Sequence, residues 1–203
     1  MRATATVRRP RRRAPSPTDW ENLSEEIRAC TRCPLHATRT QAVVYRGSLT
    51  PRVVFVGEAP GAAEDRAGVP FVGRSGRKLD AAIATVGLAP SDFGVLNLLK
   101  CRPPGNLFDP VAARTCRGYL DRQLALLRPE RLVSLGGRAL RALDPSAPPI
   151  LVAAGSPRRE RRPPLFPLLH PAAALRSRRW AERWDRDVTS LARWLGDPAA
   201  QPV

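Results

Sequence analysis

Several features that would assign a protein to a special class are missing from this 203-residue chain. No run of 18 apolar residues occurs, so we expect no transmembrane helix. The first arginines have no apolar stretch behind them, which argues against a secretory signal. Four cysteines are too few for a disulfide scaffold, and no Gly-x4-Gly-Lys-Ser/Thr phosphate loop is present. These absences favour a cytoplasmic protein whose length suits one domain with a core of its own.

Lysine is also scarce, although the chain is strongly basic. Of its 34 Lys and Arg residues only Lys78 and Lys100 are lysines, and with 18 Asp and Glu the net charge is +16. A positive field favours partners that carry phosphate, nucleic acid before an anionic membrane. A GC-rich genome would also place arginine wherever lysine would serve, so charge alone does not identify a partner.

The basic residues are concentrated at one end but not confined to it. Residues 1–18 hold six arginines, three prolines and no acid, a composition that predicts a disordered basic tail. The tail is either without function or an arm that contacts DNA. Without it the body keeps a net charge of about +10. We therefore expect one domain over residues 19–196 and a short C-terminal tail over 197–203.

Apolar runs and helical patterns alternate along the body. Short apolar runs predict strands, and apolar spacing with N-terminal proline predicts helices. Strands that alternate with helices indicate an α/β fold with three αβα layers and a central, mostly parallel, four-stranded sheet. The strands are expected at 52–56, 93–98, 131–135 and 164–169, with an extra short one at 150–152, and the helices at 18–29, 74–86, 110–127, 137–143 and 180–195.

The expected strands end in residues that suit an active site. In such sheets, ligands bind beyond the carboxyl ends of the strands. Here these ends are Gly57-Glu58, Asn97, Gly136-Gly137 and His170, which offer polar side chains or turns with exposed backbone N–H groups. This edge of the sheet is therefore the predicted site of chemistry.

The four cysteines have the spacing of a metal site. Cys30 and Cys33 form a Cys-x2-Cys pair, and Cys101 and Cys116 follow. Four thiolates suit either a zinc ion or a [4Fe–4S] cluster, and the spacing does not choose between them. The alternatives are inert buried cysteines or a redox pair, and the pair is disfavoured because Cys30 does not follow a strand.

Three motifs, taken in order, resemble those of one known family. Gly57-Glu58-Ala59-Pro60-Gly61, with Glu64 and the stretch from Pro70 to Gly76, looks like the first motif of the family 4 uracil-DNA glycosylases, the iron–sulfur type. The stretch from Asn97 to Pro104 is similar to the central motif, and that from His170 to Arg176 to the second active-site motif. The resemblance covers about residues 20–196. It implies that the four cysteines hold a [4Fe–4S] cluster, with structural zinc as the alternative.

The resemblance implies an enzyme that receives a base flipped out of DNA. Phe71 is expected to stack on uracil, the Asn97 amide to read its O4 and N3–H, and His170 to stabilise the negative charge that develops on O2. Glu58, with Glu64 as a second candidate, would orient water or stabilise the cationic sugar. The expected uracil pocket consists of Gly57, Glu58, Ala59, Ala63, Phe71, Asn97 and His170.

Contacts with DNA outside the pocket are expected from three segments. Leu175 would wedge into the gap left by the flipped base, and Arg176, with the runs 158–162 and 176–179, would contact phosphates. A solvated arginine surface is the alternative for any one of them.

Departures from the family pattern refine the expected activity. Ala59 stands where the best-known uracil glycosylases place an aspartate, so the motif does not identify the group that activates water. No basic insertion with histidine follows Asn106, so we expect turnover rather than covalent trapping, and Glu58 argues against the broader-specificity family 5. The run 172–174 is all alanine, where family members often have a bulkier residue, so we expect Leu175 to wedge into the DNA less efficiently.

The resemblance, together with the four cysteines, implies a monofunctional uracil-DNA glycosylase of base excision repair. Its expected partner is uracil-containing DNA, single- or double-stranded, and we expect a monomer in the cytoplasm, associated with a bacterial or archaeal nucleoid, without a membrane partner. The alternative is a non-catalytic nucleic-acid-binding protein on the same scaffold, stabilised by metal.

Overall fold

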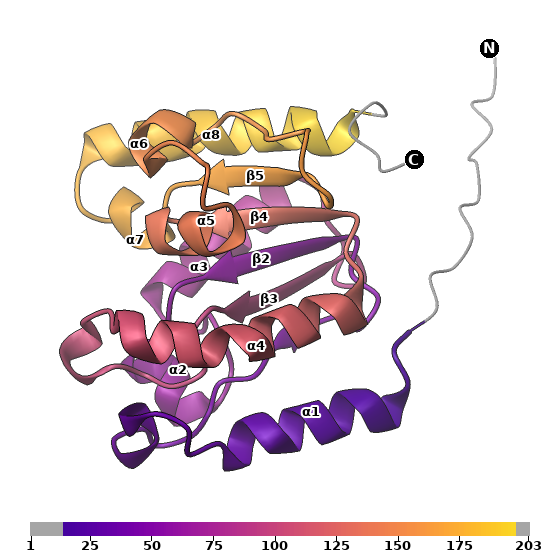
Figure 1. Cartoon of the computed structure of the whole chain (residues 1–203). Helices are drawn as coiled ribbons and strands as arrows, with labels where there is room; N and C mark the ends of the chain where they lie inside the picture. The colour runs from indigo at the N-terminus through magenta and orange to yellow at the C-terminus, as the bar shows by residue number, and fades with distance from the viewer. Residues whose placement is uncertain (1–13, 198–203) are drawn as a thin grey trace.

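The computed structural model describes residues 14–197, which form three layers around one sheet (Figure 1). The sheet has the order β1-β3-β2-β4-β5, and all neighbouring strands are parallel except β1 and β3. The strands are β1 Arg46–Gly47, β2 Val53–Gly57, β3 Phe93–Asn97, β4 Arg131–Leu135 and β5 Leu165–Leu168. The predicted α/β class and three-layer architecture are therefore confirmed.

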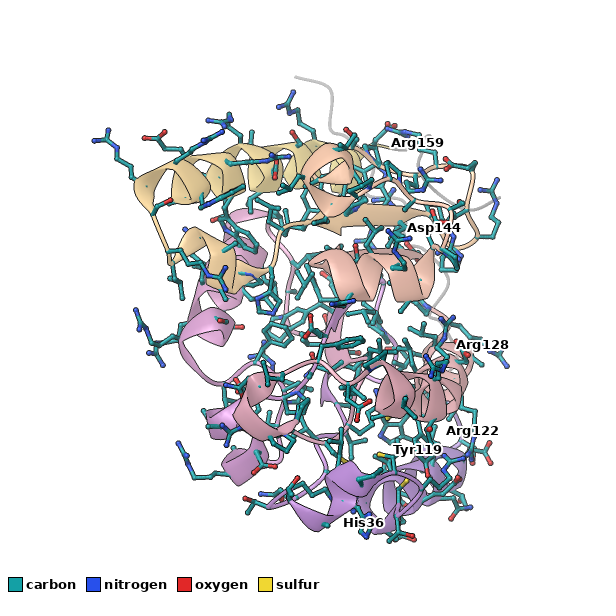
Figure 2. All side chains as sticks on the ribbon, turned by 60° about the vertical axis from the view of Figure 1, so that its left-hand side comes forward. His36, Tyr119, Arg122, Arg128, Asp144 and Arg159 are labelled. Atoms are coloured by element: carbon teal, nitrogen blue, oxygen red, sulfur yellow. The ribbon has the colours of Figure 1, made fainter. Side chains whose placement is uncertain are left out.

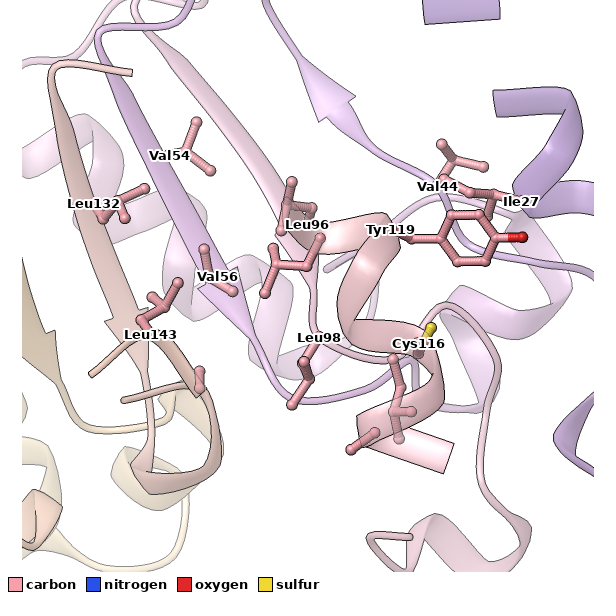
Figure 3. Packing of buried hydrophobic residues seen from close by; sticks show 14 of the residues in the cluster. Ile27, Val44, Val54, Val56, Leu96, Leu98, Cys116, Tyr119, Leu132 and Leu143 are labelled. Atoms are coloured by element: carbon pink, nitrogen blue, oxygen red, sulfur yellow. The ribbon is translucent and has the colours of Figure 1, made fainter. Parts of the chain in front are cut away.

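Helices cover both faces of the sheet because both faces of its strands are apolar. Side chains alternate along a strand, so Val54 and Val56 of β2 point to one face while Val53 and Phe55 point to the other. The first face packs against α1 Pro17–Ala29, α4 Pro110–Leu127 and α5 Gly137–Leu143, and Figure 3 shows part of this packing. The second face packs against α3 Arg74–Thr85, α7 Pro171–Ala174 and α8 Arg178–Gly196.

The remaining elements are short and lie in the connections. They are α2 Ala62–Ala67 and α6 Ile150–Ala153, with 3-10 turns at Pro34–Ala37 and Pro104–Asn106. No helix was predicted over residues 62–67. Within the described residues, no helix has the length and apolarity needed to cross a membrane.

Two predictions about the secondary structure are wrong. Residues 150–152 form the start of α6 and not a strand, because Pro149 at its N-cap leads into one helical turn that leaves Leu151 and Val152 exposed. The sheet has a fifth strand, β1, that was not expected: it pairs only Arg46 and Gly47 with β3, too few residues to produce a pattern.

The predicted tails lie mostly outside the described residues. Residues 1–13 and 198–203 are not described, so the expected disorder of the basic tail stays a prediction. Pro17 and Thr18, placed in that tail above, are the first residues of α1.

Candidate active site and cysteine cavity

The carboxyl ends of the strands bring Gly57, Phe71, Asn97 and His170 together. A Cβ added to Gly57 would lie 2.3 Å from Asn97 Oδ1 and 2.6 Å from the Phe71 ring, so only glycine allows both side chains to approach the backbone here. The Phe71 and His170 rings lie 5.9 Å apart between centroids, with 34° between their planes. Segments more than 100 residues apart thus form one constellation, as the strand ends predicted.

Asn97 has an unused hydrogen-bond acceptor in this constellation. It is the last residue of β3 and 1% exposed, and its Oδ1 has no partner among the described residues. An unpaired buried acceptor is costly, so its retention points to a ligand that supplies a donor. The backbone carbonyl of Asn97 accepts a hydrogen bond from Lys100 Nζ at 2.5 Å.

His170 is held as a neutral ring with a defined orientation. Ala172 N–H donates to its Nδ1 at 3.1 Å, which caps α7. Burial lowers the pKa of His170 to about 4, and the charge of Arg176 adds to this effect while Glu64 opposes it. A neutral ring that accepts at Nδ1 carries its proton on Nε2, so Nε2–H is free to donate toward a ligand.

Phe71 is fixed in an unusual backbone conformation by its loop. Its φ is 56°, a left-handed value that non-glycine residues rarely adopt. Gly76 of α3 admits this loop, since a Cβ there would lie 1.9 Å from the Phe71 carbonyl oxygen. Glu64 Oε1 accepts from Val72 N–H at 3.0 Å and Gly73 N–H at 2.8 Å, which ties the loop to α2.

Glu58 lies in a different environment from Glu64, which does not line the cavity described next. Both Glu58 and His170 line a cavity of about 720 Å³. Burial raises the pKa of Glu58 above its ordinary value, although the positive charge of Arg138 opposes this. Phe71 and Asn97 do not line this cavity and are buried beside it.

The other predicted site residues occupy positions around this centre. Ala63 lies in α2 close to Gly73, and Ala59 is partly buried against the core. Leu175 follows α7 and is 43% exposed, and Arg176 is near enough to His170 to influence its pKa.

The run 158–162 is distant from this site. It precedes β5 and therefore lies at the amino end of that strand, whereas His170 follows the carboxyl end. Arg158 pairs with the buried Asp144 and with Glu160, and Arg159 pairs with Asp197. These residues hold the chain together at the opposite edge.

The four cysteines surround one small cavity of about 20 Å³. Cys30 and Cys33 follow α1, Cys101 follows β3, and Cys116 lies on α4 one turn before Tyr119 (Figure 3). Sulfur atoms lie near Tyr119, at the same end of the molecule as His36 (Figure 2). Across residues 14–197 no three His, Cys, Asp or Glu side chains are arranged to hold a metal ion, so the thiols line the cavity without meeting at one point.

Positive groups and N–H donors lie around these thiols. Arg39 Nη1 donates to Cys101 Sγ at 3.0 Å. Burial raises the pKa of the Cys116 thiol, and the charge of the buried Lys100 opposes this. For Cys30, interactions with Tyr119 and Arg32 outweigh the effect of burial and lower the pKa. Four thiols with a cationic surround suit a group that carries negative charge, and a cluster with four thiolates is such a group.

Two sets of residues in these sites were missed by the sequence reasoning. Arg39 gave no signal, because only the fold brings it to Cys101. Lys100 precedes Cys101 in the chain, but only the fold shows that it is buried. The large cavity is lined by Arg114 and Arg117 of α4 and Arg138 and Arg141 of α5. Each pair has the i, i+3 spacing that places two side chains on one helix face, and this spacing was the available signal.

Comparison with known proteins agrees with the motifs. The family model of the Uracil DNA glycosylase superfamily matches residues 44–190. The chain is 43% identical over 121 residues to a type-4 uracil-DNA glycosylase of Thermotoga maritima, which is 59% of this chain and 63% of the relative. It is 41% identical over 126 residues to that of Pyrobaculum aerophilum, 62% of this chain and 64% of the relative.

A further relative is matched over more of its length. The type-4 uracil-DNA glycosylase of Sulfurisphaera tokodaii is 36% identical over 166 residues, which cover 76% of this chain and 75% of the relative. For the two relatives above, the chain spans just under two thirds of their length.

Proposed function

The chain belongs to the uracil DNA glycosylase superfamily and to its type-4 family, and on this premise we propose that it excises uracil from DNA. The reaction is hydrolysis of the N-glycosidic bond, which leaves an abasic site for base excision repair. The observation that carries the proposal is the juxtaposition of an unpaired buried amide oxygen on Asn97, the Phe71 ring and a neutral His170.

Asn97 supplies the selectivity for uracil. Its unpaired Oδ1 accepts the N3–H of uracil, and its amide N–H donates to O4. Cytosine presents an acceptor at N3 and a donor at N4, so the same amide meets each group with the wrong partner. Phe71 stacks on the flipped pyrimidine from the loop that Glu64 holds.

His170 stabilises the leaving uracil. Cleavage leaves negative charge on the base, largely on O2, and a hydrogen bond from Nε2–H to this atom is stronger in the transition state than in the ground state. The ring performs this role as a neutral donor because its pKa is about 4. Backbone N–H groups of the loop between Gly57 and Ala63, which includes Ala59, assist at the same edge.

The two carboxylates receive different roles. Glu58 shares the large cavity with His170 and is the group we assign to orient water or to stabilise the cationic sugar. Glu64 accepts hydrogen bonds from the backbone at Val72 and Gly73, so we assign it as a positioning residue that places Phe71.

DNA is the proposed partner, and a monomer is the proposed state. Leu175, exposed at the end of α7, would fill the gap in the stack, and Arg176 would neutralise a phosphate. The strand preference and the nucleoid location remain predictions.

Cys30, Cys33, Cys101 and Cys116 would hold a [4Fe–4S] cluster, with structural zinc as the alternative. The group, when bound, supplies cross-links between α1, the segment after β3 and α4. Support comes from the shared cavity and from the Arg39 hydrogen bond to Cys101. Purified protein with about four irons per chain and absorbance near 400 nm supports the cluster, whereas colourless protein with one zinc supports the alternative.

The activity is tested with a uracil-containing oligonucleotide followed by alkali. We expect strand scission at uracil and none at cytosine. His170→Ala should abolish most of the rate while DNA binding persists, and Arg193→Ala, a change at an exposed residue of α8, serves as the control. Binding without an abasic product in cluster-replete protein would assign the chain to the non-catalytic class.

A further inference from the structure

The cavity that contains Glu58 and His170 is much larger than one pyrimidine ring needs. It has a volume of about 720 Å³, in the range that encloses a complete drug-sized ligand. From the catalytic edge it extends between α4 and α5 as far as the segment 147–150. We call this extension, outside Glu58 and His170, the arginine groove. Because it opens on the catalytic groups, its occupant lies next to the reacting nucleotide.

The walls of the arginine groove are strongly positive. Arg114 and Arg117 line it from α4, Arg138 and Arg141 line it from α5, and Glu58 is the single acid in the cavity lining. The side chains of Arg114 and Arg141 have no hydrogen bond or ion pair within residues 14–197. Both side chains are exposed, so their guanidinium groups are available to an anion.

The other two arginines contact residues of the groove and contribute to its wall. Arg117 bonds to Asp121 on its own helix and to the Ala142 carbonyl of α5, which joins the two helices across the cavity. Arg138 lies over the Phe108 ring, with its guanidinium carbon 4.6 Å from the centroid. The groove therefore has a built wall and two unpaired cations.

The rest of the lining is apolar. Leu98, Leu140 and Ile150 contribute to it, with Pro148 and Pro149 on one side. Exposed apolar side chains continue beside it, with Val111 next to Pro110 and Leu151 next to Ile150. Apolar surface combined with guanidinium groups suits a ligand that has both a flat uncharged part and a phosphate, which describes a nucleotide.

We propose that the arginine groove binds the nucleotide adjacent to uracil on the same DNA strand. Its phosphate binds Arg114 and Arg141, and its base lies against the apolar lining. This inference rests on the proposed function. A base can enter the groove only after it leaves its own pair, so the groove favours single-stranded or frayed DNA over a fully paired duplex.

The test combines a change in the protein with a change in the substrate. The variant is Arg114→Gln/Arg141→Gln, and the control Arg186→Gln/Arg193→Gln removes two exposed charges from α8. The substrates are single-stranded 11-mers with one internal uracil, in which a neutral methylphosphonate replaces the phosphate on the 5′ or the 3′ side. The kcat/KM of excision is measured for each combination of protein and substrate, and the affinity of a uracil-free 11-mer is measured for each protein.

On one side of uracil, the methylphosphonate should lower kcat/KM of the parent protein by about tenfold or more, as for loss of a hydrogen bond to a charged group. In the Arg114→Gln/Arg141→Gln variant the same replacement should have less than a twofold effect, since the contact is already absent. The control should respond as the parent does. The variant should also lose most of its preference for single-stranded over duplex substrate.

Three results would overturn the inference. The first is that the losses in kcat/KM from the Arg114→Gln/Arg141→Gln variant and from the methylphosphonate add up on both sides of uracil. The second is that the Arg186→Gln/Arg193→Gln control loses its response to the methylphosphonate as the variant does. Either result means that the groove does not bind this phosphate. The third is that a peptide of alternating Asp and Leu binds the parent but not the variant, while the variant excises uracil as the parent does. The groove then binds protein. Lack of excision by the parent protein in every substrate refutes the proposed function instead, and oligonucleotide affinity then reports on the groove separately.

Discussion

Protonation of His170 should destabilise the fold in mildly acidic solution. Burial lowers the pKa of His170 from its ordinary value of 6.5 to about 4 in the folded state. Between these two pH values the unfolded chain binds a proton at this position and the folded chain does not, so stability is present above pH 6.5 and falls as the pH falls toward 4. At 1.36 kcal/mol for each pKa unit the full loss is about 3 kcal/mol. Roughly 2 kcal/mol of it falls between pH 7 and pH 5.

Urea unfolding of the parent protein and of His170→Gln at both pH values measures this contribution. The variant lacks the titrating ring, so its free energy of unfolding should fall by about 2 kcal/mol less than that of the parent over the same interval. His36→Gln is the matched control, because His36 and His170 are the two histidines of the chain and this variant keeps the His170 ring.

Two further measurements bear on the same reasoning. NMR titration of the imidazole, assigned with the His36 variant, should place the pKa of His170 near 4. Excision should remain constant from about pH 6 to 8, because the neutral ring is the proposed donor. A His170 pKa of 6 or more, or equal acid sensitivity in parent and His170→Gln protein, would show that the ring is not held neutral by burial.

Substitutions at three other residues test the remaining parts of the site. Asn97→Asp replaces the amide donor with a carboxylate and should lower uracil kcat/KM by about 100-fold or more while the fold persists, as measured by excision and thermal melting. Glu64→Ala frees the loop that carries Phe71 and should lower kcat/KM by about 10- to 100-fold. Glu64→Gln keeps an acceptor oxygen and should retain most of the parental kcat/KM. Equal loss of kcat/KM in both variants would instead indicate that the charge of Glu64 is required. Lys100→Met removes the hydrogen bond to the Asn97 carbonyl and should raise KM for uracil-containing DNA while the fold persists. A wild-type KM in this variant would exclude a positioning role for Lys100.

The strands and long helices were predictable because local patterns determine them. The apolar runs that end at Gly57 and Asn97 are bounded by turn residues, and the observed strands begin and end within one or two residues of the prediction. At 150–152 the same kind of run forms a helical turn, because three apolar residues carry no period and the preceding prolines determine the geometry.

The candidate site was predictable in its residue types but only partly in its arrangement. Motifs and strand ends selected Asn97 and His170, which the fold does bring together. The backbone role of Glu64 depends on contacts with residues eight and nine positions away in an irregular loop, and no periodic pattern reports such contacts. The arginine groove requires two helices to face each other, which is a tertiary property.

The burial of Lys100 gives this protein an internal chemical reporter. Of the two lysine amines, Lys78 lies at the surface beside Asp185, while Lys100 is 1% exposed between Asn97 and the cysteine cavity. An acylating reagent should therefore modify Lys78 at once and Lys100 only when this region opens. The rate at which mass spectrometry detects acylated Lys100 then measures local opening next to the uracil-reading residue, without any introduced label.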